Sequence, residues 1–278
     1  MTRFLKMHGL GNDFVVFDAR NSGLKLDSAL ARAVADRRLG IGCDQVIVIE
    51  QARNGADAAM RIFNADGGEV ESCGNAARCV ASLLMEENDR DRVRLDTAGG
   101  LLACQACDGG MVSVDMGAPR FGWRDIPLAR EADTKSFALA VNGETLDASA
   151  VNVGNPHCVL FGTNAEAAEI ETLGPAIERH AMFPERTNVE FASAIGKDRL
   201  RMRVWERGVG ITRACGTGAA ATMAAARRRG LVGDKAEIVL DGGVLHFAWD
   251  GKGAIVMTGP AALSFKGEVD LSALERAA

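Results

Sequence analysis

Short apolar runs, some unbroken and some alternating with polar residues, recur along most of the chain. Clusters of glycine, asparagine and aspartate, such as Asp66-Gly67-Gly68 and Asp241-Gly242-Gly243, separate these runs. Short strands joined by tight turns are typical of a mostly antiparallel sheet. The predicted strands are Asp13–Asp18, Gln45–Glu50, Ala59–Phe63, Arg92–Asp96, Met111–Met116, Val151–Asn152, His157–Phe161, Leu200–Trp205, Glu237–Leu240, Val244–Trp249 and Ala254–Thr258.

Helical patterns are fewer than strand patterns. The predicted helices are Ser28–Arg38, Asn75–Glu87, Asn164–Arg179 and Thr217–Arg229. The last consists mostly of alanine, so it has no polar face before its final turn and should be buried against closely packed sheet. It ends with Arg227-Arg228-Arg229 and Gly230. Cations favour the negative end of a helix and glycine commonly follows it, so we interpret the arginines as a helix C-terminus rather than a partner-binding site.

The chain also contains an internal repeat. Ser72-Cys73-Gly74-Asn75 matches Ala214-Cys215-Gly216-Thr217, and each stretch leads into a predicted helix. The other matches follow in the same order at offsets of 142 or 143: Met60–Asn64 with Met202–Glu206, Gly11-Asn12 with Gly154-Asn155, Phe14–Phe17 with the run around His157–Leu160, and Gln45-Val46 with Asn188-Val189. Ordered matches at nearly one offset predict two homologous halves.

A chain of 278 residues has room for about two domains of roughly 100–200 residues, in agreement with the repeat. We predict a first domain over 1–118, completed by 263–278, and a second domain over 119–262.

Composition and charge argue against several classes of protein. The 32 basic and 37 acidic residues give a net charge of −5 without a clustered basic face, so no nucleic-acid partner is expected. No stretch approaches the roughly 20 apolar residues that span a bilayer, so no membrane partner is expected. Seven cysteines and an opening without an apolar signal core predict free thiols in a cytoplasmic protein.

Cys73 and Cys215 are the strongest candidates for chemistry. A thiolate is a better base when its pKa falls below the usual value of about 8.5, and a helix N-terminus has this effect. The glycine after each cysteine leaves backbone N–H groups uncovered for a carboxylate, and Asn75 and Thr217 could cap the helix or contact that ligand. One such cysteine could be a small core residue. Matched placement in both halves instead predicts two thiols that flank one cleft and act on opposite faces of a carbon atom.

The remaining cysteines give weaker signals. Cys43, Cys79 and Cys158 lie in apolar runs and are predicted to be core residues. Cys104 and Cys107 have the spacing of a redox or zinc half-site, but no second pair supplies further ligands. We therefore predict no metal site.

Several polar residues accompany the repeated motifs. His157 is either a structural residue at a strand end or a neighbour that tunes the proton affinity of a cysteine. Glu206-Arg207 lies where the first half has Asn64-Ala65. The arginine could bind a carboxylate and the glutamate an ammonium group, although a solvated loop pair is the simpler alternative. Further amides near strand ends suit a polar ligand, although asparagine also favours turns: Asn12, Gln45, Asn64, Asn155 and Asn188.

Together these motifs resemble those of the diaminopimelate epimerase family. The resembling segments are Met7–Phe14, Gly40–Gln45, Phe63–Gly67, Glu71–Asn75, Gly154–His157, Thr187–Glu190, Trp205–Gly208 and Ala214–Gly218. The resemblance implies an α+β fold (α/β-type) of two pseudo-symmetric domains. Each would be a mostly antiparallel β-sheet rolled around a central α-helix, with the active site in the cleft between them.

The same resemblance implies an isomerase that epimerises L,L-2,6-diaminopimelate to the meso form without PLP or another cofactor. The pathway would be lysine and peptidoglycan precursor biosynthesis, and the assembly a homodimer. Cys73 and Cys215 would be the base and acid pair, with His157 and Glu206 supporting catalysis. The implied substrate contacts are Asn12, Gln45, Asn64, Gly74, Asn75, Asn155, Asn188, Glu206, Arg207, Gly216 and Thr217.

The chain departs from the family pattern at two places. Ala76 stands where members often have glycine, and the chain has no tyrosine, so Phe265 is expected at a position that belongs to the dimer contact. Three alternatives stay open: a proline racemase type of enzyme, a thiol redox protein in which Cys73 and Cys215 form a reversible disulfide, and a non-catalytic binding domain. Glu206-Arg207 and the amides favour a substrate with two polar ends.

Overall fold

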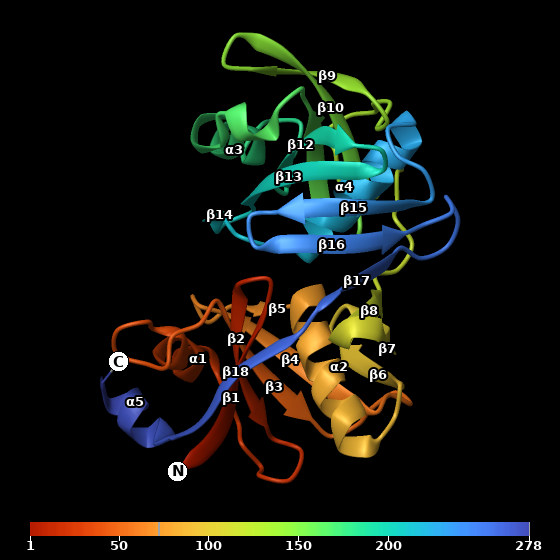
Figure 1. Cartoon of the computed structure of the whole chain (residues 1–278). Coiled ribbons are helices and arrows are strands. Elements are labelled where there is room, and N and C mark those ends of the chain that lie inside the picture. The colour runs from red at the N-terminus through yellow and green to blue at the C-terminus, as the bar shows by residue number, and fades with distance from the viewer. Residues whose placement is uncertain (72, 278) are drawn as a thin grey trace. The chain divides into compact units, whose positions relative to one another are not determined.

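The computed structural model describes residues 1–71 and 73–277 (Figure 1). Ser72 of the first cysteine motif and Ala278 of the predicted returning segment lie outside the described residues. The chain forms two compact units. Unit 1 is Met1–Val114 together with the segment that begins at Gly259, and unit 2 is Asp115–Thr258. These bounds fall four residues before the predicted divisions at 118 and 262.

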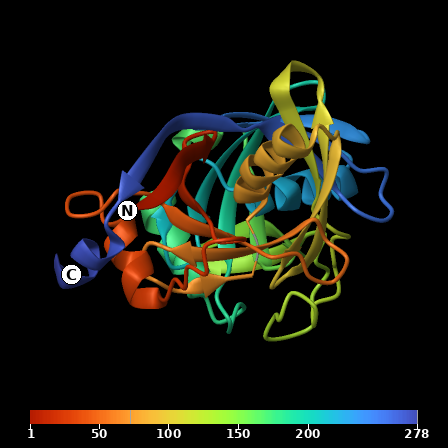
Figure 2. The same ribbon diagram turned by 90° about the horizontal axis from the view of Figure 1, so that it is seen from below.

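Unit 1 combines a mixed, mostly antiparallel sheet with three α-helices among its described residues. Its elements are β1 (Thr2–Gly9), β2 (Asn12–Asp18), α1 (Ser28–Ala35), β3 (Gln45–Glu50), β4 (Ala58–Asn64), β5 (Glu69–Val70), α2 (Gly74–Asn88), β6 (Arg92–Thr97), β7 (Gly100–Cys107), β8 (Met111–Asp115, whose last residue belongs to unit 2), β18 (Ala262–Val269) and α5 (Leu271–Ala277). Strand β1 pairs antiparallel with both β2 and β18, which lies beside it in two views (Figure 1, Figure 2). The β2–β3 and β4–β6 pairs are parallel.

Unit 2 repeats this plan. Its elements are β9 (Phe137–Val141), β10 (Glu144–Asn152), β11 (Pro156–Phe161), α3 (Ile170–Glu178), β12 (Asn188–Gly196), β13 (Arg199–Glu206), β14 (Gly210–Ile211), α4 (Gly216–Arg229), β15 (Lys235–Leu240), β16 (Gly243–Ala248) and the first part of β17 (Val256–Pro260). Strand β10 pairs antiparallel with β9 and β11, and the parallel pairs are β11–β12 and β13–β15.

Even the strand register repeats between the units. Phe14 lies opposite Gln45 in the β2–β3 pair, and His157 lies opposite Asn188 in the β11–β12 pair. Both partners are displaced by the same 143 positions. The α+β fold with two related domains is therefore confirmed.

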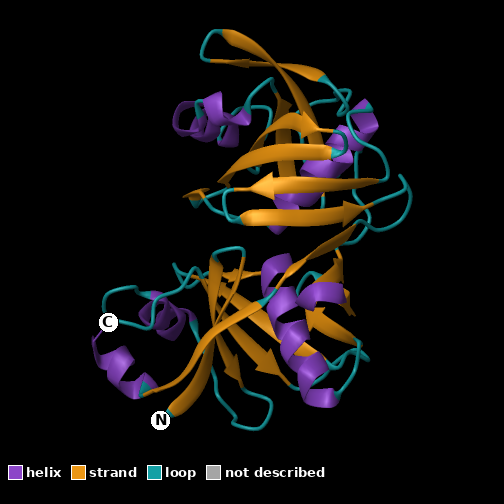
Figure 3. Cartoon of the chain, in the orientation of Figure 1, coloured by secondary structure: helices purple, strands orange, loops and turns teal. Residues whose placement is uncertain are grey.

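A long helix lies against the sheet of each unit, as Figure 3 shows. Helix α2 packs against β1, β6 and β7, and α4 packs against β10, β11, β12, β13, β15 and β16. The alanines of α4 from Ala219 to Ala226 are buried, because side chains of this size let the surrounding strands approach closely.

The three arginines lie in the last turn of α4 and bind groups of unit 2, so the predicted helix C-terminus is confirmed. Arg227 pairs with Asp234, and the Nη1 atom of Arg229 lies 2.7 Å from Oδ2 of Asp147. Gly230 follows them in the left-handed conformation, with φ of 75°.

Two predicted helices are shorter than expected. The first ends at Ala35 because Asp36 leaves the helical conformation and its carboxylate accepts from the N–H groups of Arg38 and Leu39. The third is divided, since Ala165–Ala167 forms a 3-10 turn and Ala168 is extended before α3 begins. The strands β1, β5, β7, β9, β12, β14 and β18 and helix α5 were not among the predicted elements.

Candidate active site

Each repeated cysteine stands immediately before the first residue of a long helix. Cys73 precedes α2 and is extended, with φ of −147° and ψ of 111°. Cys215 precedes α4 in a similar conformation, with φ of −116° and ψ of 109°. Gly74 and Gly216 begin the helices, so the unpaired N–H groups of both first turns lie next to a thiol. The predicted placement of both cysteines at helix N-termini is confirmed.

The thiol of Cys73 lies in a group of amides in unit 1. Its Sγ is 3.9 Å from Oδ1 of Asn12, and Nδ2 of Asn75 donates to the same oxygen at 3.1 Å. The buried guanidinium of Arg78 donates from Nη2 to Oδ1 of Asn75 at 2.9 Å. Burial lowers the pKa of Arg78, and the charges of the nearby Cys79 and Cys73 sulfurs, when ionised, oppose that shift, so the guanidinium is close enough to Cys73 to attract its thiolate.

A carboxylate cluster at the β1–β2 turn holds Asn12 in place. Nδ2 of Asn12 donates to Oδ2 of Asp44 at 3.0 Å. Asp13 receives hydrogen bonds from Arg37 and Lys6. Burial alone would raise the pKa of Asp13, but these two cations lower it to about 2. Asp13 is therefore an anion that fixes the turn bearing Asn12.

Gln45 and Asn64, two further predicted substrate contacts in unit 1, are hydrogen-bonded to one another. Nε2 of Gln45 donates to Oδ1 of Asn64 at 2.9 Å across the β3–β4 pair. Oε1 of Gln45 is buried and has no hydrogen-bond partner among the described residues. It is an acceptor that a ligand N–H group could satisfy.

The surroundings of Cys215 in unit 2 are acidic. Its Sγ accepts from N–H of Gly218 at 3.4 Å and lies 3.5 Å from Oγ1 of Thr217. The carboxyl group of Glu206 accepts from Oγ1 of Thr212 and lies close enough to Cys215 to influence its pKa. Burial raises the pKa of Cys215 well above the usual value, and the charges of Glu206 and Glu190 raise it further. Burial likewise raises the pKa of Glu206.

His157 binds a carboxyl group rather than a thiol. Its side chain and that of Glu190 are both fully buried, and Nδ1 of His157 is 2.7 Å from Oε1 of Glu190. Nε2 of His157 is 2.7 Å from Oδ1 of Asn155, so both ring nitrogens face oxygen atoms. Burial raises the pKa of Glu190, and the attraction of His157 opposes that rise. The coulombic influence of His157 extends to Glu206, whose charge in turn acts on Cys215.

Asn188 shapes the loop that carries Arg207. Its Oδ1 accepts from the backbone N–H of Arg207 at 2.9 Å, and its Nδ2 donates to the carbonyl of Pro156 at 3.1 Å. Arg207 is exposed and donates from Nη1 to the carbonyl of Glu185 at 3.2 Å. Asn188 thus positions Arg207 through the backbone.

Two residues of these networks were missed by the sequence analysis as functional candidates. Glu190 lies within a resembling segment but was given no role, and Arg78 was not considered. Both sit in otherwise apolar stretches next to a repeated motif. A charged residue on the buried face of a predicted helix or strand is the signal that would have found them.

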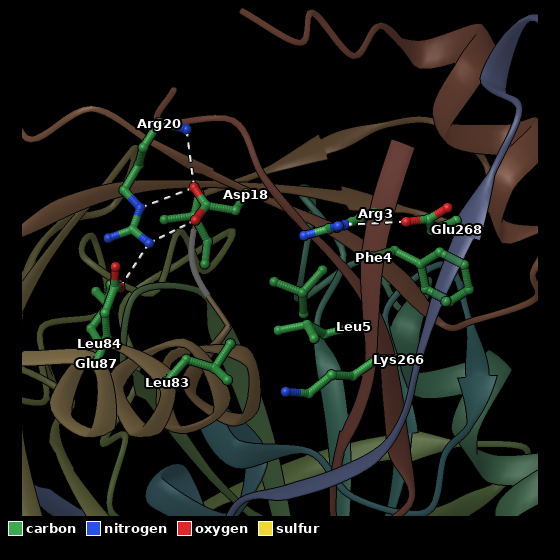
Figure 4. Close-up of a pocket in the computed structure, with 13 residues that line it drawn as sticks. Arg3, Phe4, Leu5, Asp18, Arg20, Leu83, Leu84, Glu87, Lys266 and Glu268 are labelled. Carbon is green, nitrogen blue, oxygen red and sulfur yellow. Dashed lines mark hydrogen bonds and ion pairs between the residues drawn. The ribbon is translucent and has the colours of Figure 1, made fainter. Parts of the chain in front are cut away.

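The cavity in Figure 4, of about 610 Å³, lies in unit 1 and contains none of the predicted site residues. Its apolar lining includes Leu5, Leu83 and Leu84. Its charged groups are largely paired, since Arg20 binds Asp18 and Glu87, and Arg3 binds Glu268.

Within the described part of the chain, no group of three or more His, Cys, Asp or Glu side chains is arranged to hold a metal ion. None of the helices described is long and apolar enough to cross a membrane.

Comparison with known proteins shows which family the chain belongs to. The sequence model described as diaminopimelate epimerase matches residues 4–122 and 149–264. The chain belongs to the diaminopimelate epimerase family. Curated relatives named diaminopimelate epimerase include a protein of Rhodospirillum centenum, 53% identical over 96% of this chain and 92% of the relative. Another, of Erythrobacter litoralis, is 54% identical over 96% of this chain and 97% of the relative.

As a member of the diaminopimelate epimerase family, the chain is an isomerase. The family resemblance inferred from the sequence motifs is confirmed. Solved structures show a shared fold at low identity. A hydroxyproline epimerase from Agrobacterium vitis aligns with a TM-score of 0.68 at 19% identity, covering 96% of this chain and 91% of that one. A phenazine biosynthesis protein of the PhzF family from Bacillus anthracis aligns with a TM-score of 0.69 at 16% identity, covering 97% and 99%.

Proposed function

We propose that the chain epimerises L,L-2,6-diaminopimelate to the meso form by a two-base proton transfer between Cys73 and Cys215. The reaction needs no cofactor in this proposal and belongs to cytoplasmic lysine and peptidoglycan precursor biosynthesis. Curated relatives near 50% identity carry the name of this activity. The observation that supports the mechanism most directly is the matched thiol before α2 and before α4.

In the proposed step one sulfur is a thiolate and the other a thiol. The thiolate takes the α-proton, and the electron pair of the broken C–H bond delocalises into the adjacent carboxylate. The second thiol gives its proton to the opposite face of the carbon, which leaves that sulfur as a thiolate. The reverse reaction exchanges the two roles, so no proton or electron is gained or lost overall.

The developing negative charge needs a stabilising environment. Backbone N–H groups at a helix N-terminus bind carboxylates, and donors fixed in place stabilise charge at the transition state. We propose that Gly74-Asn75 and Gly216-Thr217 bind the carboxylate next to the reacting carbon. Both stretches belong to the first turn of a helix.

The second amino-acid end of the substrate requires its own contacts. We assign the distal carboxylate to Arg207, whose guanidinium is exposed and whose backbone is fixed by Asn188. The buried oxygen of Gln45 would accept from an ammonium group. Asn12, Asn64 and Asn155 complete the proposed set of substrate contacts, and Glu206 and His157 support the acid at Cys215.

A homodimer is part of the proposal. Phe265 on β18 is 51% exposed and packs edge-on against Phe4, with ring centroids 6.1 Å apart. An exposed aromatic at the position expected for the dimer contact suits this role. Sedimentation equilibrium of the wild type and of Phe265→Asp tests it, since the variant should shift toward the monomer.

The central experiment is proton NMR of the reduced protein with L,L-diaminopimelate in D2O. We expect loss of the α-proton signal together with appearance of the meso isomer. Cys73→Ala and Cys215→Ala should each abolish turnover to the meso form, whereas Cys107→Ala, at the last residue of β7, should not. If the α-protons of other amino acids exchange with solvent but those of diaminopimelate do not, the proposed substrate is wrong and the two-thiol mechanism still stands. Wild-type turnover in either active-site variant would exclude the two-thiol mechanism.

A further inference from the structure

Arg78 is a buried cation that the proposed mechanism does not use. Its side chain on α2 is 0% exposed, although arginine is rarely buried completely without a specific partner. Nη2 donates to Oδ1 of Asn75 at 2.9 Å, and Nε donates to the carbonyl of Pro260 at 3.2 Å. Both partners belong to unit 1. The guanidinium is therefore held from two sides behind the N-terminus of α2.

The guanidinium determines how two amide side chains are turned. Arginine has donors only, so the atom of Asn75 that faces it must be the oxygen. The NH2 group of Asn75 then faces Asn12, which must present its own oxygen, at 3.1 Å. The NH2 group of Asn12 consequently faces Asp44, where it donates at 3.0 Å. One buried cation thus orders the donors and acceptors around Cys73.

The backbone makes room for this arrangement. Gly9 ends β1, and a Cβ atom at this position would lie 2.9 Å from Nη2 of Arg78 and 3.2 Å from Cβ of Asn75. Those distances are shorter than ordinary van der Waals contacts. Glycine at position 9 therefore allows the guanidinium and Asn75 to meet.

The second half shows that the fold itself does not require an arginine here. At the offset of 142 that relates Cys73 to Cys215, the counterpart of Arg78 is Ala220, which is also fully buried. In unit 2, α4 packs against its sheet with only the methyl group of Ala220 at the position that Arg78 occupies in α2. Burying a charge is unfavourable, so its presence in one half alone points to a local role beside Cys73.

We propose that Arg78 is a positioning residue of the first half of the site: it fixes the amides of Asn75 and Asn12 and places a positive charge behind the Cys73 thiolate. This inference rests on the proposed function in one respect, the use of Cys73 as a base. The oriented oxygen of Asn12 is then the acceptor that faces the thiol after it has taken a proton.

The test compares Arg78→Met and Arg78→Lys with Leu84→Ala, a buried residue of the same helix that contacts neither amide through a polar group. Iodoacetamide alkylation of each cysteine is followed against pH by peptide mass spectrometry, which needs no substrate. In Arg78→Met we expect Cys73 to react about 10-fold more slowly at neutral pH, because the nearby cation is lost. The reaction of Cys215 should be unchanged.

Activity provides the second readout. In Arg78→Met, kcat for diaminopimelate should fall by roughly 10- to 100-fold, in line with other losses of positioning at an active site. Arg78→Lys should restore the alkylation profile, since the charge remains, but only part of kcat, since one ammonium group cannot hold both Asn75 and Pro260. Leu84→Ala should lower thermal stability and leave both readouts unchanged.

An unchanged Cys73 alkylation profile in folded Arg78→Met would overturn the proposal. If that variant does not fold, Gly9→Ala decides the question, because it keeps the charge and displaces the guanidinium from Asn75. An unaltered kcat in Gly9→Ala would likewise overturn the proposal. A wild type without diaminopimelate turnover would refute the proposed function, while the alkylation data would still decide the role of Arg78.

Discussion

The thiol of the first half lies among amides and one buried guanidinium, whereas the thiol of the second half lies among two carboxyl groups and an imidazole. Both stand before a helix that begins at the next residue. The helix N-terminus alone would favour the thiolate at both places. The surrounding charges are therefore what distinguishes the two cysteines.

This difference matters because a two-base reaction requires one of the two sulfurs to be a thiolate and the other to be a protonated thiol. A cation beside Cys73 favours its thiolate, and carboxylates beside Cys215 favour its thiol. Two halves with identical surroundings would lack this bias. The comparison predicts that Cys73 is the resting base and Cys215 the resting acid in the proposed reaction.

The substitutions that create the difference can be read along the repeat. Glu206 replaces Asn64 at an offset of 142, and Glu190 replaces Ile47 at an offset of 143. His157 replaces Phe14, and in the opposite direction Ala220 replaces Arg78. Duplication preserved the strands, and these few exchanges gave each thiol its own environment.

Removing the carboxylate next to Cys215 should have the largest effect on the difference between the two thiols. In Glu206→Gln we expect a loss of roughly 100-fold in kcat/KM, within the range for groups that assist proton transfer. The alkylation midpoint of Cys215 should move to lower pH, because a negative neighbour that raises the pKa of this thiol is gone. Alkylation and steady-state kinetics measure the two effects.

The exposed Glu131 supplies a matched control, since Glu131→Gln makes the same chemical change on the surface of unit 2. It should alter neither quantity. A Cys215 midpoint that stays in place in Glu206→Gln would show that the acidic environment is not what distinguishes the second thiol.

A methyl group at Gly218 should have the next largest effect. A Cβ atom there would lie 2.8 Å from Oε1 of Glu190 and 3.3 Å from Sγ of Cys215. Either Glu190 must leave His157 or the thiol must move, and a displacement of this size costs on the order of 10- to 100-fold in rate. We expect this loss in kcat of Gly218→Ala with little change in the thermal midpoint of unfolding. Full activity would show that Glu190 and Cys215 can shift without consequence.

Much of the fold was predictable because both halves carry the same signals. The β3 strand was predicted with its observed bounds, and α2 and α4 were predicted to within one residue at the ends where the cysteines lie. Turn-forming residues and a repeated motif act locally, so they are visible in sequence. The repeat added independent support for each element that had a counterpart.

Strands β1 and β18, two of the elements that were missed, pair with one another from opposite ends of the chain. Strand β18 consists largely of exposed and half-buried residues, and its pairing with β1 joins Lys6 to Phe265 across most of the chain. Strand β1 alternates basic and apolar residues over only part of its length. Such strands gain their stability from hydrogen bonds to each other, which local patterns do not reveal.

The site was predictable in its repeated residues and not in its supporting ones. Cys73 and Cys215 were identified because they recur before helices. Arg78 and Glu190 have no counterpart of their own kind in the other half, so the repeat gave no signal for them. A charge within an apolar run was the only signal for them in the sequence, and the partners that they bind are shown only by the folded chain.

The two halves also differ in how their stability depends on pH. Asp13 of the first half is charged, whereas its counterpart at an offset of 143 is Pro156, which carries no charge. The pKa of Asp13 is about 2 in the folded chain against 3.8 for the ordinary carboxyl. A lowered pKa stabilises the fold above the unfolded value, by about 2 kcal/mol here, and this stability is lost as pH falls toward 2. Asp13→Asn should therefore be less stable by about that amount at pH 7.

Urea unfolding followed by far-UV circular dichroism measures this at neutral and acidic pH. The difference between wild type and Asp13→Asn should narrow as the pH approaches 3, and Asp91→Asn, an exposed change in unit 1, should show no such difference. A difference in unfolding free energy that stays constant with pH would mean that the charge of Asp13 does not stabilise unit 1.

The smallest effect is expected at Ala76, the counterpart of Gly218 at an offset of 142. Ala76 is fully buried in the first turn of α2 and replaces the glycine that the second half needs. No glutamate opposes it, because the counterpart of Glu190 is Ile47. Ala76→Gly should cost about 1 kcal/mol of stability through helix propensity and leave kcat unchanged.

Thermal unfolding and steady-state kinetics of Ala76→Gly, measured beside Gly218→Ala, give opposite patterns if the halves differ as described. The first variant loses stability and keeps its rate, and the second keeps its stability and loses its rate. Equal effects on rate at both positions would show that the first turns of α2 and α4 act in the same way. In that case the difference between the two thiols would have to come from the charges of Arg78 and Glu206 alone.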